Sequence, residues 1–349
     1  MVFVGAACGR PYTCEEGIVE KICNQIDELL AKVDFEAIWP GFVPCDYVLF
    51  ANDKAYMKGK EIPMDGLWGA NVAQEYEGRQ IATWNLQNSE NPDLELTVCG
   101  IVHEMFHAFQ NNSGETRHAN EFALFAYPRD LDNIRLKLAE NHYLVKAFTE
   151  NSLVDLEQFV VLRKARRRII GEAAMHQEQL SETKEGMAEF AGLMALSQIS
   201  RPKFVEYAEK IIGHLRDAER LLLPRYISYS VGCMMCLVMK ANGIDFYHDL
   251  TDVRTVFELL PDKVGQVEKI FNKHVVELEA KFAHLRENYS EKVECDTKIG
   301  GFNPMAMTRL EDEIYCDYGV HLQNGVDTNE PTLLIMEAGE LNKVKAYIR

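Results

Sequence analysis

Apolar and polar residues alternate with a helical period at the start of this chain and with a two-residue period soon afterwards. The segment Thr13-Cys14-Glu15-Glu16 has the spacing of a capping box, and apolar residues follow it at helical intervals, which predicts a helix over 14–33. The stretches "DYVLFAN" and "LWGANVAQEYEGRQIATWNL" are rich in β-branched and aromatic residues, and the second is broken at Glu77-Gly78. They predict a strand followed by a hairpin, so residues 1–90 are expected to form a mixed α/β part.

Helical periodicity dominates the chain between residues 91 and 290. Asn91-Pro92-Asp93 supplies a cap, a proline suited to a first turn and an acid that complements the helix dipole, which predicts a helix from there to Gly114. The same periodicity predicts further helices over Leu153–Glu178, Glu182–Leu196, Lys203–Leu222, Tyr229–Asn242 and Val264–Glu287.

The pattern changes once more after Cys295. "KIGGFNPMAMTRL", "EIYCDYGVHLQ" and "PTLLIMEA" are short extended runs separated by Gly, Asn and Pro, which predicts a small β-rich module over 291–349 that ends in a short helix. The whole chain is therefore expected to be α+β, with a mixed sheet first, a helical domain over 91–290 next and the β-rich module last.

Composition narrows the class of protein. The 349 residues are 47% hydrophobic, enough for each part to bury a core, yet no run of about 18 apolar residues appears. The amino end, "MVFVGAACGRPYTCEE", lacks a basic leader, so we expect neither a membrane span nor a signal peptide, and a cytoplasmic location. Nine scattered cysteines, an odd number, do not resemble a secreted disulfide framework. A formal charge of −17 opposes nucleic acid or anionic membranes as partners.

One basic cluster, "RKARRR" at 163–168, departs from this acidic balance. The main interpretation is a solvated helix face balanced by acids such as Glu157, Glu172 and Glu178. The alternative is that the cluster faces a functional site and binds a carboxylate or another anion through its arginines.

The segment His103-Glu104-Met105-Phe106-His107 carries the candidate chemistry. On a helix, residues four apart lie on one face, so both imidazoles can point at one metal ion, while Glu104 lies about 100° round the helix. Two imidazole nitrogens suit Zn²⁺, a third protein ligand leaves a fourth place for water, and Glu104 is placed to act as the base for that water. The alternative is a pair of partly buried histidines with hydrogen-bonded rings and no metal.

A second segment, "ETKEGMAEFAGL" at 182–193, places Glu185 and Glu189 on one helix face, and Gly186 and Ala188 are small enough for close helix packing. H-E-x-x-H followed downstream by E-G-x-A-E-[FY] resembles the gluzincin group of zinc metallopeptidases, a zincin-like, peptidase MA-like group that includes thermolysin-like enzymes and aminopeptidases. This resemblance implies that Glu185 is the third ligand of one Zn²⁺ and that Glu189 orients a ligating imidazole. Glu182 is the alternative third ligand. The alternative interpretation of Glu185 and Glu189 is an ordinary solvated helix face of an acidic protein.

A third segment, "YISYSVGCMMCLVMKANG", resembles the Tyr-x-x-Gly helix start of the aminopeptidase branch. The resemblance implies that Tyr229 stabilises the oxyanion of a tetrahedral intermediate, with Tyr226 as the alternative residue. A tyrosine packed at a helix start for structural reasons is the other interpretation of both. Cys233 and Cys236, in the same apolar helix, are expected to be core residues.

The chain departs from the family in two respects. Glu185 follows His107 by 78 residues, a far longer interval than in thermolysin-like members, so 115–180 is expected to be an insert of two long antiparallel helices with a break near Asn151-Ser152. The Gly-x-Met-Glu-Asn signature of the aminopeptidases is missing, because "WGANVA" has no glutamate in register. If the architecture of the group holds, "QIATWNL" is the edge strand that pairs with an extended peptide.

The hypothesis is a zinc metallopeptidase that hydrolyses a peptide or a small amide, with Glu104 exchanging protons between water and the departing amine. Two alternatives stay open: a non-catalytic binding protein on a zincin fold, and a zinc hydrolase of a non-peptide amide or ester. The residues give no prediction of substrate length or oligomeric state.

Overall fold

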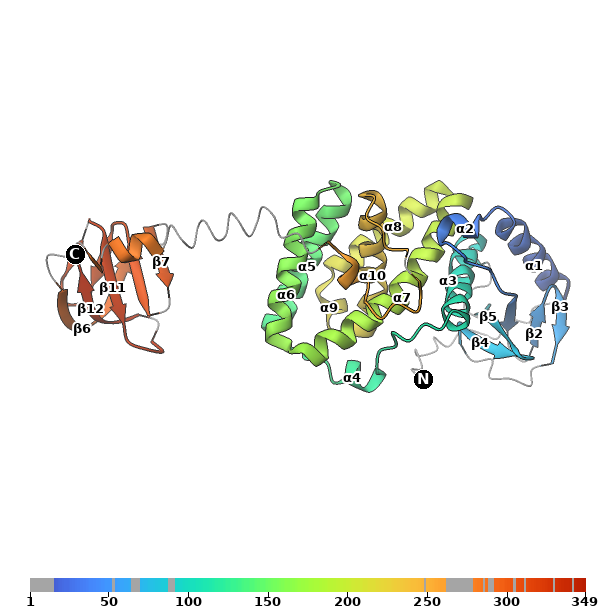
Figure 1. Ribbon diagram of the computed structural model, residues 1–349, viewed down its shortest axis with the longest axis horizontal. Helices are drawn as coiled ribbons and strands as arrows, with labels where there is room; N and C mark the ends of the chain where they lie inside the picture. The colour runs from blue at the N-terminus through green and yellow to red at the C-terminus, as the bar shows by residue number, and fades with distance from the viewer. Residues whose placement is uncertain are drawn as a thin grey trace. The chain divides into compact units, whose positions relative to one another are not determined.

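The 349-residue chain, described by a computed structural model, forms two compact units, Met1–Val264 and Gly265–Arg349 (Figure 1). The predicted α+β class is confirmed, since helices and separate sheets are both present. The structure describes residues 16–51, 54–63, 70–86, 92–247, 249–261, 279–284, 286–287, 292–303, 306–310, 312–328, 330–340 and 342–349.

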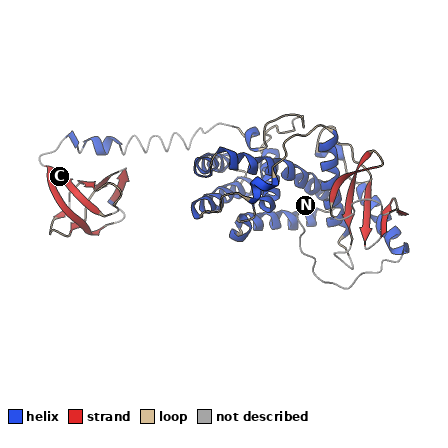
Figure 2. Ribbon diagram, turned by 90° about the horizontal axis from the view of Figure 1, so that it is seen from below, coloured by secondary structure: helices blue, strands red, loops and turns tan. Residues whose placement is uncertain are grey.

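A five-stranded sheet with the order β3-β2-β1-β5-β4 lies at one end of the first unit (Figure 2). Its strands are β1 Tyr47–Ala51, β2 Lys54–Met57, β3 Lys60–Ile62, β4 Val72–Tyr76 and β5 Arg79–Asn85. The predicted strand and the β4–β5 hairpin are confirmed, but the prediction that "QIATWNL" forms the sheet edge is wrong. It falls on β5, whose other side pairs in parallel with β1, so that β4 takes the edge among the described strands.

The described helices of the first unit are α1 Glu16–Leu30, α2 Phe35–Ile38, α3 Leu94–Asn112, α4 Glu121–Phe125, α5 Leu131–Thr149, α6 Leu153–Ile170, α7 Glu172–Ile199, α8 Arg201–Arg216, α9 Ala218–Leu221 and α10 Pro224–Ala241, and a short 3₁₀ turn, Phe257–Leu259, follows them. The predicted helix is confirmed, but its predicted start is wrong: Asp93 is the N-cap of α3, accepting a hydrogen bond from the backbone N–H of Leu96, and Pro92 lies before the helix. The predicted capping box of α1 and the predicted cap at Asn91 fall on residues 13–15 and 87–91, which lie outside the described residues. No described helix is both long enough and apolar enough to cross a membrane.

The predicted break near Asn151-Ser152 is confirmed, and α5 and α6 run antiparallel, because contacts join Lys146 to Asp155 and Glu140 to Arg163. The predicted helix Leu153–Glu178 is wrong at its end: α6 stops at Ile170, and α7 begins directly after Gly171. Helix α7 is therefore much longer than predicted. Helix α10 also begins earlier than predicted, at Pro224, whose missing N–H suits a first turn.

Helix α7 crosses two other helices at very short range (Figure 1). A Cβ atom added at Gly186 would lie 2.3 Å from the Cα of Gly232 in α10. A Cβ added at Gly192 would lie 2.5 Å from the carbonyl oxygen of Cys99 in α3. Both distances are shorter than side chains tolerate, so glycine is required at these crossings. The predicted close helix packing at Gly186 is confirmed.

Buried charges join α5, α6 and α7. Arg163 and Arg166 are fully buried, so the predicted solvated face of "RKARRR" is wrong for these two residues. Arg163 binds both carboxylate oxygens of Glu182, at 2.6 and 3.1 Å, and Arg166 binds Glu178 at 2.7 and 2.9 Å. Both arginines also bind Glu140. Because the chain's own carboxylates satisfy them, neither arginine is free to bind a substrate anion.

The formal charges of this buried charge cluster balance. It contains three basic and three acidic side chains: Lys137, Arg163, Arg166, Glu140, Glu178 and Glu182. Burial raises the pKa of Glu178, but the charges of Arg166, Lys137 and Arg163 outweigh that effect and hold it well below its usual value. Glu178 therefore stays ionised against fixed partners, and the cluster holds α7 between its neighbours.

The second unit contains a seven-stranded sheet with the order β10-β9-β6-β12-β11-β8-β7, in the part of the chain where the sequence predicted β-rich structure. Its strands are β6 Lys292–Phe302, β7 Met307–Leu310, β8 Glu313–Cys316, β9 Val320–Leu322, β10 Asp327–Thr328, β11 Thr332–Met336 and β12 Lys343–Ile348. The predicted terminal helix is wrong, because β12 pairs on both sides, with β6 and β11. Most of the predicted helix Val264–Glu287 lies outside the described residues.

The buried charge cluster predicts a large loss of stability when one partner is removed. Arg166→Met leaves Glu140 and Glu178 buried without this cation, so we expect the free energy of unfolding to fall by about 3–5 kcal/mol. Urea unfolding followed by far-ultraviolet circular dichroism measures it. Arg168→Ala, at an exposed position of the same helix, is the control and should change stability by less than about 0.5 kcal/mol. Equal stability of the two variants would contradict this role of the cluster.

Candidate metal centre

Helix α3 presents His103 and His107 on one face, as their spacing predicted. Both side chains are buried, with 7% and 8% of the residue surfaces exposed, and the two rings lie 4.8 Å apart between centroids. Each ring has a polar partner for its Nδ1 atom. His103 Nδ1 lies 3.0 Å from Glu189 Oε2, and His107 Nδ1 lies 2.7 Å from Gln110 Oε1. Both Nε2 atoms are thereby left for another ligand.

Gln110 determines which nitrogen of His107 carries the proton. The amide nitrogen of Gln110 donates a hydrogen bond to the carbonyl oxygen of Lys184 at 3.1 Å. Its Oε1 atom therefore faces His107 and can only accept, so His107 Nδ1 is the donor. A neutral His107 with its proton on Nδ1 directs the lone pair of Nε2 away from Gln110, which is the form that binds a metal ion.

Helix α7 brings Glu185 to these two histidines. Glu185 Oε2 lies 3.2 Å from His107 Nε2 and 3.8 Å from His103 Nε2, and only 3% of the residue is exposed. Burial raises the pKa of Glu185, but the adjacent imidazoles of His107 and His103 and the guanidinium group of Arg225 outweigh it and hold the pKa well below its usual value. An ionised carboxylate thus faces both imidazoles inside the protein.

The donor set fits a metal ion. One ligand atom from each of His103, His107 and Glu185 lies within 4.8 Å of the others, and all three residues are buried. Two imidazoles and a carboxylate from three separate turns of helix match the sites that hold divalent transition-metal ions with one place open. Glu189 supports this arrangement, since it accepts hydrogen bonds from His103 and from Tyr207 of α8. The predicted group of three is brought together.

Glu182, the alternative third ligand, lies elsewhere. It is fully buried and binds Arg163 through both oxygens, so that alternative is wrong. His118 and His176 are exposed, and neither belongs to the group of three.

Glu104 lies beside His103 and is 8% exposed. Burial lowers the pKa of His103, but the nearby carboxylates of Glu185, Glu189 and Glu104 outweigh it and raise the pKa to about 10. In the absence of a metal ion, this histidine therefore carries a positive charge that balances the surrounding carboxylates. A divalent cation would take over that balancing charge when the proton leaves.

The two candidate tyrosines differ in position. The Tyr229 ring stacks on the His103 ring, with centroids 5.6 Å apart and planes 9° apart. Burial and the neighbouring Glu185 carboxylate raise the pKa of Tyr229, so its hydroxyl keeps its proton and can donate it in a hydrogen bond. Tyr226 is 50% exposed and contacts the side chain of Arg220 instead. Of the two, Tyr229 lies at the candidate site and Tyr226 lies outside it.

The sequence pattern did not identify two residues of the centre. Gln110, one turn after His107, holds the Nδ1 atom of that imidazole. Arg225, one turn before Tyr229, donates from Nη2 to Glu185 Oε1 at 2.9 Å. Their spacing could have identified both residues. Gln110 lies three residues from His107 and Arg225 lies four from Tyr229, and residues three or four apart share a helix face.

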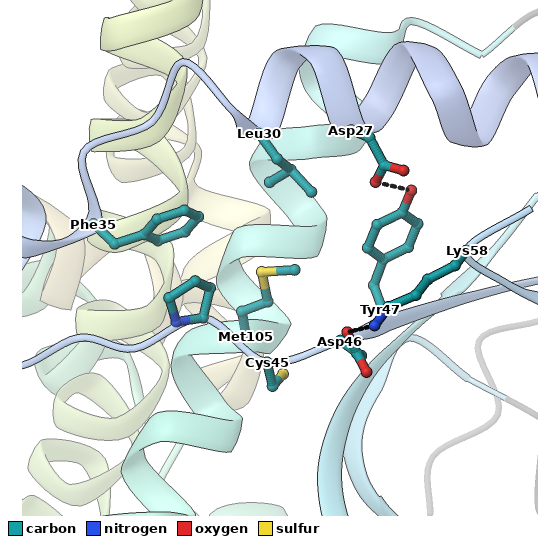
Figure 3. A pocket seen from close by; sticks show the side chains of 9 residues that line it. Asp27, Leu30, Phe35, Cys45, Asp46, Tyr47, Lys58 and Met105 are labelled. Carbon is teal, nitrogen blue, oxygen red and sulfur yellow. Dashed lines mark hydrogen bonds and ion pairs between the residues drawn. The ribbon is translucent and has the colours of Figure 1, made fainter.

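A pocket of about 420 Å³ lies on another side of α3, between α1 and β1 (Figure 3). It is lined by Met105, which points away from the face that carries the histidines. Its polar groups are already paired, since Tyr47 donates to Asp27 at 2.8 Å and Lys58 lies 3.0 Å from Asp46. This pocket is therefore separate from the metal centre.

No protein-family model matches the chain, and neither a curated protein nor a solved structure matches it.

The geometry predicts that one metal ion binds per chain and that each of the three ligands is needed. His103→Ala, His107→Ala and Glu185→Ala should each lose the ion on dialysis, because two remaining ligands hold a divalent ion weakly. Elemental analysis of the purified protein measures metal per chain. His142→Ala, at an exposed position of α5, is the control and should keep the ion. Retention of a full equivalent by His107→Ala would rule out this ligand set.

Proposed function

We propose that the chain is a zinc-dependent metallopeptidase of the gluzincin type, with a zincin-like core. One observation carries the proposal: the H-E-x-x-H segment of α3 and the E-G-x-A-E segment of α7, which are 78 residues apart, meet so that His103, His107 and Glu185 share one buried point. The gluzincin resemblance of the sequence implies this meeting. The second match is Glu189, which contacts His103 as the resemblance implies.

Zinc is the metal that the ligands favour. Two imidazole nitrogens and one carboxylate oxygen are the ligands of many catalytic zinc sites, and three protein ligands leave a fourth place for water. When bound there, Zn²⁺ would supply Lewis acidity, which makes a water molecule a better nucleophile and polarises an amide carbonyl.

Residues of the chain would supply proton transfer, stabilisation of the oxyanion and orientation of the metal ligands. Glu104 follows a ligand directly and is buried, so its carboxylate can accept a proton from the attacking water and return it to the departing amine. Tyr229 keeps its proton and lies against His103, so its hydroxyl can donate a hydrogen bond to the negative charge that develops on the substrate oxygen. Gln110 and Glu189 hold the two imidazoles in their orientations.

Glu104→Gln tests the proposed reaction. The amide keeps the size of the side chain but cannot accept a proton, so we expect peptide hydrolysis to fall by about 10²–10⁴-fold while zinc content is unchanged. Cleavage of a quenched-fluorescent peptide library and elemental analysis measure the two quantities. Glu95→Gln, the same change in the first turn of α3, is the control.

The same assay separates the alternatives. Wild-type protein that holds zinc but cleaves no peptide would exclude the metallopeptidase. A panel of non-peptide amides and esters then distinguishes a different zinc hydrolase from a non-catalytic binding protein.

Tyr229→Phe and Tyr226→Phe form a matched pair. Removal of the Tyr229 hydroxyl should lower kcat by about 10²-fold with little change in KM, because the hydrogen bond is made chiefly in the transition state. Tyr226→Phe should retain wild-type kinetics, since this residue contacts Arg220 instead. Steady-state kinetics on a cleaved peptide measure both, and equal losses in the two variants would refute the assignment.

A further inference from the structure

Arg225, near the start of α10, contacts two other helices and a residue of its own helix around the metal centre. Its Nη2 atom lies 2.9 Å from Glu185 Oε1 in α7, and its Nε atom lies 3.2 Å from Glu121 Oε1 in α4. The centre of its guanidinium group lies 5.3 Å from the centre of the Tyr229 ring, one turn further along α10. The side chain is 39% exposed, so Arg225 is more accessible than the ligands that it adjoins.

These contacts give the two oxygens of Glu185 different surroundings. Oε2 faces the Nε2 atoms of His103 and His107, at 3.8 and 3.2 Å. Oε1 faces the guanidinium group of Arg225. A carboxylate without such a partner can turn and offer both oxygens to a metal ion, which would occupy an additional coordination place. A cation that holds one oxygen opposes that turn.

We propose that Arg225 is a positioning residue that limits Glu185 to one ligand oxygen and so keeps a coordination place open. This inference rests on the proposed metal centre, and it concerns the carboxylate rather than the identity of the substrate. Arg225 acts through Glu185 and needs no contact of its own with the reacting atoms.

The chemistry of arginine explains why this residue type suits the position. The guanidinium group is planar and offers donors along separate edges, so one side chain can bind Glu121 and Glu185 together while its face lies against Tyr229. Glu121 binds the Nε atom of the same guanidinium group and so helps to fix its plane. A lysine ammonium group is a single point charge and cannot fix that plane.

Co²⁺ offers a direct test, because the intensity of its visible absorption falls as its coordination number rises. The apo-protein is loaded with Co²⁺ as wild type, Arg225→Gln, Arg225→Lys and Arg216→Gln. The last replaces an exposed arginine of α8 and is the control. We expect Arg225→Gln to show a weaker band and a metal affinity lower by about 10–100-fold. Arg225→Lys should change both quantities in the same direction by less, and Arg216→Gln should match wild type.

The outcomes separate this inference from the proposed function. If wild type binds Co²⁺ and both Arg225 variants keep its spectrum and affinity, Arg225 does not position Glu185 and the metal centre stands. If wild type binds neither Co²⁺ nor Zn²⁺, the metal centre and the inference fail together. Circular dichroism checks folding, and if Arg225→Gln is unfolded, Arg225→Lys decides: wild-type absorption and affinity in that variant would overturn the proposal.

Discussion

Buried carboxylates on α7 must each find a partner, and this requirement governs how the helices are arranged. The buried Glu178, Glu182 and Glu185 and the partly buried Glu189 follow one another along one side of α7, and an unpaired carboxylate inside a protein is strongly unfavourable. The partners come from different neighbours: arginines of α6, histidines of α3, Arg225 of α10 and Tyr207 of α8. The position and rotation of α7 are therefore fixed along its length, and Glu185 is placed as part of that stripe.

The long segment between His107 and Glu185 takes part in this arrangement. Helix α6 supplies Arg163 and Arg166 to the glutamates of α7, and α4 supplies Glu121 to Arg225. Ion pairs thus join the segment to α7, the helix of Glu185, and to Arg225 beside the metal centre. Although this segment separates His107 from Glu185 in sequence, it can pack against α7, because α5 and α6 fold back on each other before α7 begins.

Local patterns predicted what depends on spacing within one helix. His103 and His107 share a face because of their four-residue interval, and Gly186 allows a close crossing because it lacks a side chain. Two predictions that depend on distant partners were wrong, whereas the meeting of Glu185 with the two histidines was implied by the family resemblance and not by any local pattern. Arg163 and Arg166 belong to a run that looks solvated, and only their carboxylate partners on other helices, Glu140, Glu178 and Glu182, show why they are buried. The place of β5 in the sheet depends on β1, whose paired residues lie 35 positions earlier, and no alternation within β5 reveals that neighbour.

The balanced composition of the buried charge cluster has a consequence for how the protein responds to ionic strength. Its six ionisable groups are shielded from water, so dissolved ions screen them little, whereas the excess of negative charge on the rest of the chain faces the electrolyte. Salt should therefore alter the long-range repulsion between this protein and anionic molecules and leave the internal supports of α7 almost unaffected. The approach of charged molecules should therefore depend on salt concentration, whereas the ion pairs that hold α7 should not.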